Sequence, residues 1–127
     1  MSTAKGSPEM FTGDVYMDPL ARGEEPSRAR VSKVRFTPGA RTAWHAHGVG
    51  QVLYVTDGHG LHQARGGEIQ QIRAGEVVQS PAGQWHWHGA GPDDFMAHLS
   101  ITEGTGDERP EITWGEHVTD DEYHGRG

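Results

Sequence analysis

The chain has 127 residues, a length typical of one domain, and its 18 acidic and 11 basic residues give a net charge of −7 with neutral histidine. An acidic protein lacks the positive charge that binds phosphate backbones, so we expect no nucleic-acid partner. The absence of cysteine excludes disulfides, thiolate metal sites and cysteine nucleophiles. No apolar run approaches the ~18 residues of a membrane-spanning helix, and the polar start MSTAKGSPEM lacks a signal-peptide apolar region. We therefore expect a cytoplasmic protein with no membrane partner.

The order of apolar and polar residues predicts an all-β domain. Residues 1–10 are expected to form a flexible N-terminal arm and residues 11–127 a single domain, with a polar loop over Ala21–Arg28. After this loop, short alternating runs are separated by glycine, proline and aspartate, which is typical of a β-sandwich or barrel. The expected strands are Arg30–Phe36, Thr42–His47, Gln51–Thr56, Gly60–Arg65, Glu68–Arg73, Glu76–Ser80, Gln84–His88 and Phe95–Ile101.

Two turns and one short helix complete this prediction. A turn is expected over Asp57–Gly60, and Gly66-Gly67 is the strongest hairpin signal because both positions tolerate a positive φ. In the acidic tail, Thr119 and Glu122 have the spacing of a capping box, which predicts a short C-terminal helix.

The histidines suggest where the chemistry lies. His45 and His47 are two residues apart on one predicted strand, and His86 and His88 have the same spacing on another. Side chains alternate across a strand, so the two imidazoles of each pair share a face and could chelate one metal ion.

The residues around these pairs extend the pattern. Gly39 is followed after five residues by His45-Ala46-His47, then after three by Gln51 and after six by Gly58. Downstream, Gly75 is followed after five residues by Pro81-Ala82-Gly83 and after two by His86.

These two spacings resemble the two sequence motifs of the cupin superfamily. The resemblance implies a small jelly-roll β-barrel, a cupin domain, with a metal ion bound by His45, His47, Gln51 and His86. The sequence departs from the motifs at Gln51, where a glutamate is usual, and at Ala90, where the second motif ends in asparagine.

The chemistry of this ligand set can be argued separately. Three imidazoles and an amide oxygen suit a first-row divalent ion such as Mn(II), Fe(II), Ni(II), Co(II) or Zn(II). A neutral Gln51 in place of a carboxylate leaves the ion more positive, which makes it a stronger Lewis acid.

A closer resemblance covers nearly the whole chain. PGARTAWHAHGVGQ, HWHGA, MAHLSI and WGEHVTDDEY together are similar to a bacterial subgroup of small cupins, of which some members are manganese-dependent hydroxynitrile lyases. The resemblance implies that the metal is Mn(II) and that His88 and His98 lie beside it. Thr102 stands where these lyases carry a glutamine.

Local patterning permits two interpretations of His88 and His98. Each is either a buried histidine bonded to the backbone or a general base near the metal. His98 shares a strand face with Met96 and Ser100, and the opposite, more apolar face is expected to be the packed one.

The remaining candidates are expected to be structural. Four histidines are predicted to be exposed: His59, His62, His117 and His124. Val52, Leu53 and Tyr54 are predicted to be core residues of one strand, and Trp85 and Trp87 are predicted to lie on the exterior of the sheet. No partner for Arg41 is evident in the sequence.

Three functions fit these observations. The leading hypothesis is a metal-dependent lyase that acts on a small molecule, with His98 or His88 moving a proton while a C–C bond breaks. The alternatives are an Fe- or Mn-dependent dioxygenase or peroxide-dependent oxidase, and a non-catalytic cupin that binds a small molecule. Uneven charge and exterior tryptophans further predict a homodimer or homotetramer.

Overall fold

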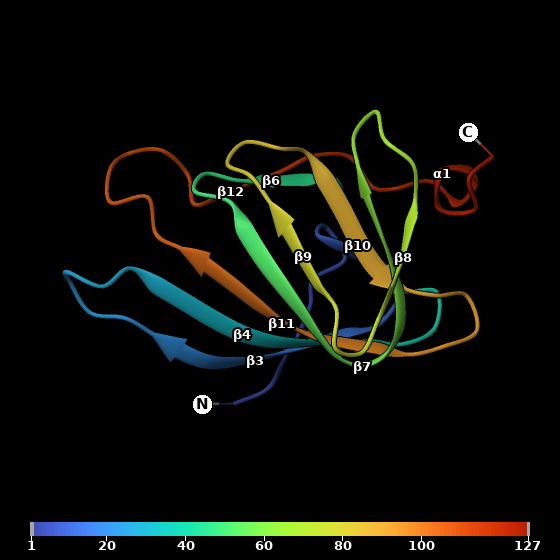
Figure 1. Cartoon of the computed structure of the whole chain (residues 1–127), viewed down its shortest axis with the longest axis horizontal. Coiled ribbons are helices and arrows are strands. Elements are labelled where there is room, and N and C mark those ends of the chain that lie inside the picture. Colours follow the sequence, from blue (N-terminus) through green and yellow to red (C-terminus); the bar gives the residue numbers. More distant parts are fainter. Residues whose placement is uncertain (1, 127) are drawn as a thin grey trace.

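The computed structural model describes residues 2–126, so the first residue of the predicted arm and the last residue of the predicted domain lie outside the described residues. Within this range the regular secondary structure is almost entirely strand (Figure 1). The elements are β1 (Ala4–Lys5), β2 (Phe11–Thr12), β3 (Val15–Arg22), β4 (Ala29–Phe36), β5 (Arg41–Thr42), β6 (His45–His47), β7 (Gln51–Ala64), β8 (Gln70–Arg73), β9 (Val77–Ser80), β10 (His86–Ala90), β11 (Met96–Glu103), β12 (Ile112–Trp114) and α1 (Asp120–Tyr123).

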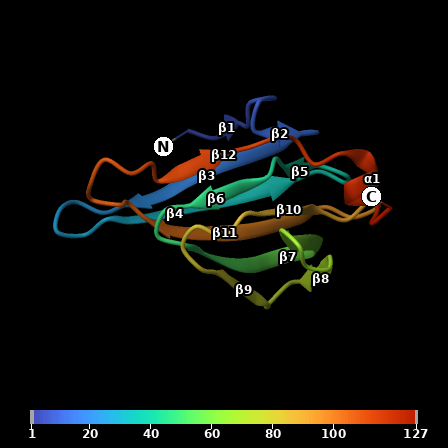
Figure 2. The same ribbon diagram turned by 90° about the horizontal axis from the view of Figure 1, so that it is seen from above.

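Two antiparallel layers share the long strand β7. The first half of β7 pairs with β11 and β9, and β11 continues through β4 and β3 to β1. The second half pairs with β10 and β8, and β10 also pairs with β5 and β6. Seen from above, β8 and β9 lie at one edge and β1 at the other (Figure 2). This curled sheet confirms the predicted all-β jelly roll with a short C-terminal helix.

The predicted turn over Asp57–Gly60 is wrong. The ladder to β11 continues through Asp57 and Gly58, and the two predicted strands are one bent strand. Gly58 makes this bend with a φ of +78°, and a Cβ there would collide with the Phe95 carbonyl. Glycine therefore bends the strand without ending it.

Other element predictions are partly confirmed. The Gly66-Gly67 hairpin joins β7 to β8, and the Thr119–Glu122 capping box opens α1. The predicted strand Thr42–His47 is split into β5 and β6. At the break, the Ala43 and Trp44 amides donate to carbonyls of Met10 and Glu116 instead of a neighbouring strand.

Four short or irregular strands were not predicted: β1, β2, β3 and β12. β2 and β12 are too short to show an alternating pattern, and β3 contains Pro19, which lowers strand propensity. β3 extends to Arg22, so the predicted loop begins later than expected. The segment predicted as an arm contains β1, which pairs with β3.

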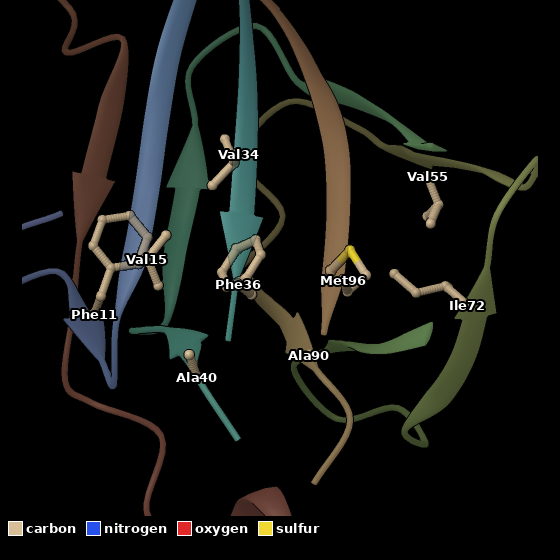
Figure 3. Packing of buried hydrophobic residues seen from close by; sticks show 9 residues of the cluster. All are labelled: Phe11, Val15, Val34, Phe36, Ala40, Val55, Ile72, Ala90 and Met96. Carbon is tan, nitrogen blue, oxygen red and sulfur yellow. The ribbon is translucent and has the colours of Figure 1, made fainter. Parts of the chain in front are cut away.

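The main core fills the space between the layers (Figure 3). Its residues are Phe11, Val15, Val34, Phe36, Ala40, Val55, Ile72, Ala90 and Met96. On β7 the core prediction holds for Leu53, which is fully buried. It is wrong for Tyr54, which is 43% exposed, because alternation turns it to the outer face.

The C-terminal tail covers the outside of β10. Trp87 points away from His86 as predicted, yet it is fully buried, because the tail residues Val118 and Tyr123 pack against it. Arg41 fastens the tail: its guanidinium donates to the Val118 carbonyl at 2.8 Å and lies 4.5 Å from the Tyr123 ring centroid. The tail thus supplies the partner that the sequence did not reveal.

No helix within residues 2–126 is both long and apolar enough to cross a membrane.

Candidate metal centre

Three strands bring five of the predicted site residues into the space between the layers. His45 and His47 lie on β6, Gln51 at the start of β7, and His86 and His88 on β10. All five side chains are buried. His45 and His86 are cross-strand partners, and their ring centroids are 4.4 Å apart.

The structure brings these groups to one point. Nitrogen atoms of His45, His86 and His88 lie within 4.8 Å of one another and could hold a metal ion. The His47 ring lies 5.1 Å from that of His45, and the Gln51 amide oxygen lies 3.0 Å from Nε2 of His86. His45, His86 and His88 are therefore the group that could hold an ion, with His47 and Gln51 beside it, and the ligand set of His45, His47, Gln51 and His86 stays a prediction.

Hydrogen bonds to the backbone set the tautomers of two rings. Nδ1 of His45 lies 2.9 Å from the Ala43 carbonyl and Nδ1 of His86 lies 3.1 Å from the Gln84 carbonyl. A carbonyl only accepts, so both Nδ1 atoms carry hydrogen and both Nε2 atoms keep a free lone pair. A hydrogen bond from one ring nitrogen to a backbone carbonyl is usual for histidines that bind a metal through the other nitrogen.

The free lone pairs fit a cation. Nε2 of His86 and Oε1 of Gln51 are both acceptors, and at 3.0 Å they repel unless positive charge lies near both. The buried Nε2 atoms of His47 and His88 have no hydrogen-bond partner among residues 2–126. Unpaired buried nitrogens are costly: a metal ion would satisfy that of His47, and either a metal ion or the hydroxyl of a bound small molecule would satisfy that of His88.

Burial keeps the imidazoles neutral. Desolvation lowers the pKa of His47 to about 4, helped by the nearby His86, and lowers that of His45 well below its usual value. The pKa of His86 is lowered for the same reason. Only neutral imidazole binds a metal, so these rings are ready to bind at neutral pH.

His98 extends the site by one further ring. It is fully buried on β11, and its Nε2 lies 3.1 Å from Nδ1 of His88. The prediction that His98 faces the interior is confirmed, but the opposite face is not the packed one. Phe95 and Ile101 are 57% and 38% exposed, because that face of the sheet points to solvent.

His62 is the site residue that the sequence analysis missed. His62 is 5% exposed, and its ring stacks on that of His86 with a centroid distance of 5.4 Å. Oγ of Ser80 lies 3.4 Å from Nε2 of His62. Burial lowers its pKa to about 4. The sequence analysis missed His62 because the wrongly predicted turn left the orientation of this strand open. On the continuous strand β7, His62 is the cross-strand partner of His88 and lies on the same face.

The other predictions for histidines are mixed. His117 and His124 are exposed as expected. His59 is half-buried, with its Nε2 3.2 Å from the Gln71 side chain.

A cavity of about 130 Å³ opens beside the histidines. His45, His47, Gln51, His88 and His98 line one part of it. The rest is mostly apolar, with walls formed by Phe11, Met17, Val34, Ile112 and Trp114. A larger groove of about 580 Å³ on the protein is lined by none of the buried histidines. The smaller cavity is therefore the one that can place a small molecule against the candidate metal centre.

Comparison with known proteins agrees with this geometry. A family described as the cupin domain matches residues 32–102. The chain belongs to the cupin superfamily.

Its relatives extend the comparison to the whole chain. This cupin is 44% identical over 122 residues to the (R)-mandelonitrile lyase of Granulicella tundricola, which covers 96% of this chain and 92% of that protein. A cupin-like protein of known structure from Thermotoga maritima is 39% identical, with a TM-score of 0.88 over 97% of this chain and 92% of its own. A cupin-2 domain protein from Rhodospirillum rubrum is 17% identical with a TM-score of 0.75, covering 98% of this chain and 79% of its own, and shows the fold alone.

Ala90, which departs from the second motif, and Thr102, which departs from the lyase subgroup, both have defined places in this cupin. Ala90 is fully buried, and its carbonyl accepts a 2.6 Å hydrogen bond from the Tyr123 hydroxyl of the tail. Thr102 is the cross-strand partner of Gln51.

Proposed function

We propose that this cupin is a metal-dependent lyase that cleaves or forms the C–C bond between cyanide and a carbon bearing a hydroxyl or carbonyl oxygen. The observation that carries the proposal is the cluster of buried, neutral imidazoles with unpaired nitrogens beside a small cavity. The 44% identity to a protein named (R)-mandelonitrile lyase supports this reaction class over the others.

His45, His47, Gln51 and His86 would hold the ion. Mn(II) is the first candidate, and Fe(II), Ni(II), Co(II) and Zn(II) are the others, since imidazole and amide ligands suit them all. When bound, such an ion supplies Lewis acidity that stabilises negative charge on the substrate oxygen.

His88 and His98 would move the proton. The unpartnered Nε2 of His88 takes the hydroxyl proton, and its Nδ1–H donates to Nε2 of His98. As the C–C bond breaks, its electron pair leaves with cyanide and the carbon–oxygen bond becomes a carbonyl. His88 then returns the proton to cyanide, so the products are an aldehyde or ketone and hydrogen cyanide.

The apolar wall would bind the rest of the substrate. Phe11, Val34 and Trp114 offer hydrophobic contact, and the small volume favours a compact substrate. Exclusion of water by these walls strengthens the electrostatic interactions inside.

The test is cleavage of mandelonitrile by protein loaded with Mn(II), followed by benzaldehyde absorbance. Wild type should exceed the buffer background by orders of magnitude, while His86→Ala should lose both bound metal and activity. His117→Ala removes an exposed histidine and serves as the matched control. A fully loaded wild type that stays at background refutes the lyase proposal. Oxygen uptake in the same samples would instead indicate an oxidase or dioxygenase.

We also propose that the protein forms a homodimer or homotetramer. Tyr54, Val77 and Ile101 are exposed on one outer sheet face, and Tyr54 and Val77 are cross-strand partners. Lys33 and Asp57, paired at 3.7 Å on this face, supply both charges that a two-fold contact between copies can match. Sedimentation equilibrium of wild type and Val77→Asp tests this: the variant should dissociate, and a monomeric wild type refutes the proposal.

A further inference from the structure

We propose that Ser100 is a positioning residue of the metal centre, because its hydroxyl accepts the amide hydrogen of Gln51 and leaves the amide oxygen facing the histidines. The inference rests on the proposed function in one respect: the centre is taken to hold a divalent ion.

The contacts define one orientation of the Gln51 amide. Its Nε2–H donates to Oγ of Ser100 at 2.8 Å, and its Oε1 lies 3.0 Å from Nε2 of His86. Gln51 is 5% exposed, so hydrogen bonds to water contribute little to the orientation of its amide. Ser100 pairs with Leu53 across the strands, which places it on the same inner face as Gln51.

An amide ligand needs such a partner, whereas a carboxylate does not. The two ends of the amide are nearly equal in shape, but only the oxygen has lone pairs for a metal. With the oxygen turned to the centre, the NH₂ group points into a buried place and is costly if unpaired. Ser100 supplies the acceptor that removes this cost.

The reversed amide would block the centre. Its Nε2–H would donate to Nε2 of His86 and occupy the lone pair that His86 offers an ion. With Ser100 present, a hydroxyl can pair with either end of the amide, because it both donates and accepts. Without Ser100, the NH₂ group of Gln51 has a hydrogen-bond partner, Nε2 of His86, only in the reversed orientation. Loss of Ser100 therefore favours the orientation that excludes the metal.

The prediction concerns affinity for the metal itself. Ser100→Ala should weaken Mn(II) binding by roughly 10- to 100-fold, the usual effect of removing a group that orients a ligand. Ser100→Thr keeps the hydroxyl and should bind as wild type does, while Ser100→Val has nearly the same shape without the hydroxyl and should match the alanine variant. Ser32→Ala is the matched control: Ser32 is the cross-strand partner of Ser100 and lines the same cavity, yet makes no hydrogen bond to Gln51.

A second background separates orientation from general damage. In Gln51→Glu both side-chain oxygens accept, so no buried donor is stranded when Ser100 is removed. Ser100→Ala should then cost no more than about threefold in Mn(II) affinity, and the difference between the two backgrounds measures the coupling.

The experiment is a titration of metal-free protein with Mn(II), with the free ion followed by its electron paramagnetic resonance signal. Thermal unfolding confirms that each variant folds. A 10-fold or greater loss in Ser100→Ala and Ser100→Val, with Ser100→Thr and Ser32→Ala unchanged and the loss reduced in Gln51→Glu, supports the role. Wild-type affinity in Ser100→Ala, or an equal loss in both backgrounds, overturns it while the proposed function stands. A wild type that binds neither Mn(II) nor, in parallel titrations, Fe(II), Ni(II), Co(II) or Zn(II) overturns both.

Discussion

Nε2 of His98 lies 3.1 Å from Nδ1 of His88, and both rings are buried between the layers of the barrel. The opposite nitrogen of His88 has no partner within the described residues and belongs to a ring that lines the cavity. The pair therefore connects two buried rings that both line the cavity. When His88 takes up a proton, its hydrogen bond to His98 can stabilise the positive charge on the His88 ring.

Replacing His98 should separate proton movement from metal binding. His98→Gln keeps a group that can hydrogen-bond to His88 but, unlike an imidazole, cannot accept a proton from it. We expect kcat for mandelonitrile cleavage to fall by about 100-fold or more, with bound metal unchanged. Elemental analysis and steady-state kinetics on the same samples measure both quantities, with His117→Gln as the exposed control. Full activity in His98→Gln would remove His98 from the proton path.

The buried histidines should make the metal-free protein sensitive to acid. Burial lowers the pKa of His62 and of His98 to about 4, against about 6.5 in an unfolded chain. The unfolded state thus binds more protons between these values, so stability is complete above pH 6.5 and is lost as pH falls towards 4. Each residue should cost about 2 kcal/mol between pH 7 and pH 5.

Urea unfolding in the presence of a chelator at pH 7 and pH 5 measures this loss. His62→Leu removes one of the groups and should give a shallower dependence on pH than wild type. An equal dependence in the two proteins would mean that His62 is already charged, or not buried, in the folded state.

Much of the site was predictable because it depends on spacing along strands. His45 with His47, and His86 with His88, share faces by strand periodicity alone, and the motif spacing adds Gln51. His62 was not predictable, since its face depends on whether the chain turns or bends at Gly58. The tautomers of the rings were also beyond the sequence, because they depend on carbonyls such as that of Gln84.

The fold, like the site, was predictable where it depends on local pattern and not where it depends on tertiary contacts. Strands with regular alternation, such as β4 and β11, were predicted to within a few residues. Contacts between distant segments were not: Trp87 lies on the outer face as predicted, but its cover comes from Val118 and Tyr123 in the tail. Local pattern defines a face of a strand, and tertiary packing decides what covers it.

The stability that the C-terminal tail adds should depend on Arg41 far more than on its exposed partner Asp120. Arg41 is 5% exposed and bonds to the Val118 carbonyl as well as to Asp120. Hydrogen bonds from a buried charged group contribute about 1.5–3 kcal/mol, so Arg41→Met should lower the free energy of unfolding by about that amount.

Asp120→Asn is the matched variant. Arg41 lowers the pKa of the Asp120 carboxyl, so the pair contributes stability above the ordinary carboxyl pKa and loses it as pH falls. Because Asp120 is exposed, its variant should change stability much less than Arg41→Met. Thermal unfolding at pH 7 compares the two, and equal losses would show that the ion pair, not the backbone contact, fastens the tail.

The bend in β7 should tolerate no side chain. Gly58 and Gly39 have nearly the same φ, +78° and +81°, so alanine is strained at both. They differ in space: a Cβ at Gly58 would collide with the Phe95 carbonyl, whereas nothing lies within 4 Å of one at Gly39. Gly39→Ala should therefore cost about 1 kcal/mol from strain, and Gly58→Ala about 3 kcal/mol or more because the β7–β11 ladder must also shift. Urea unfolding measures the difference, and equal costs would mean that the bend adjusts without disturbing the ladder.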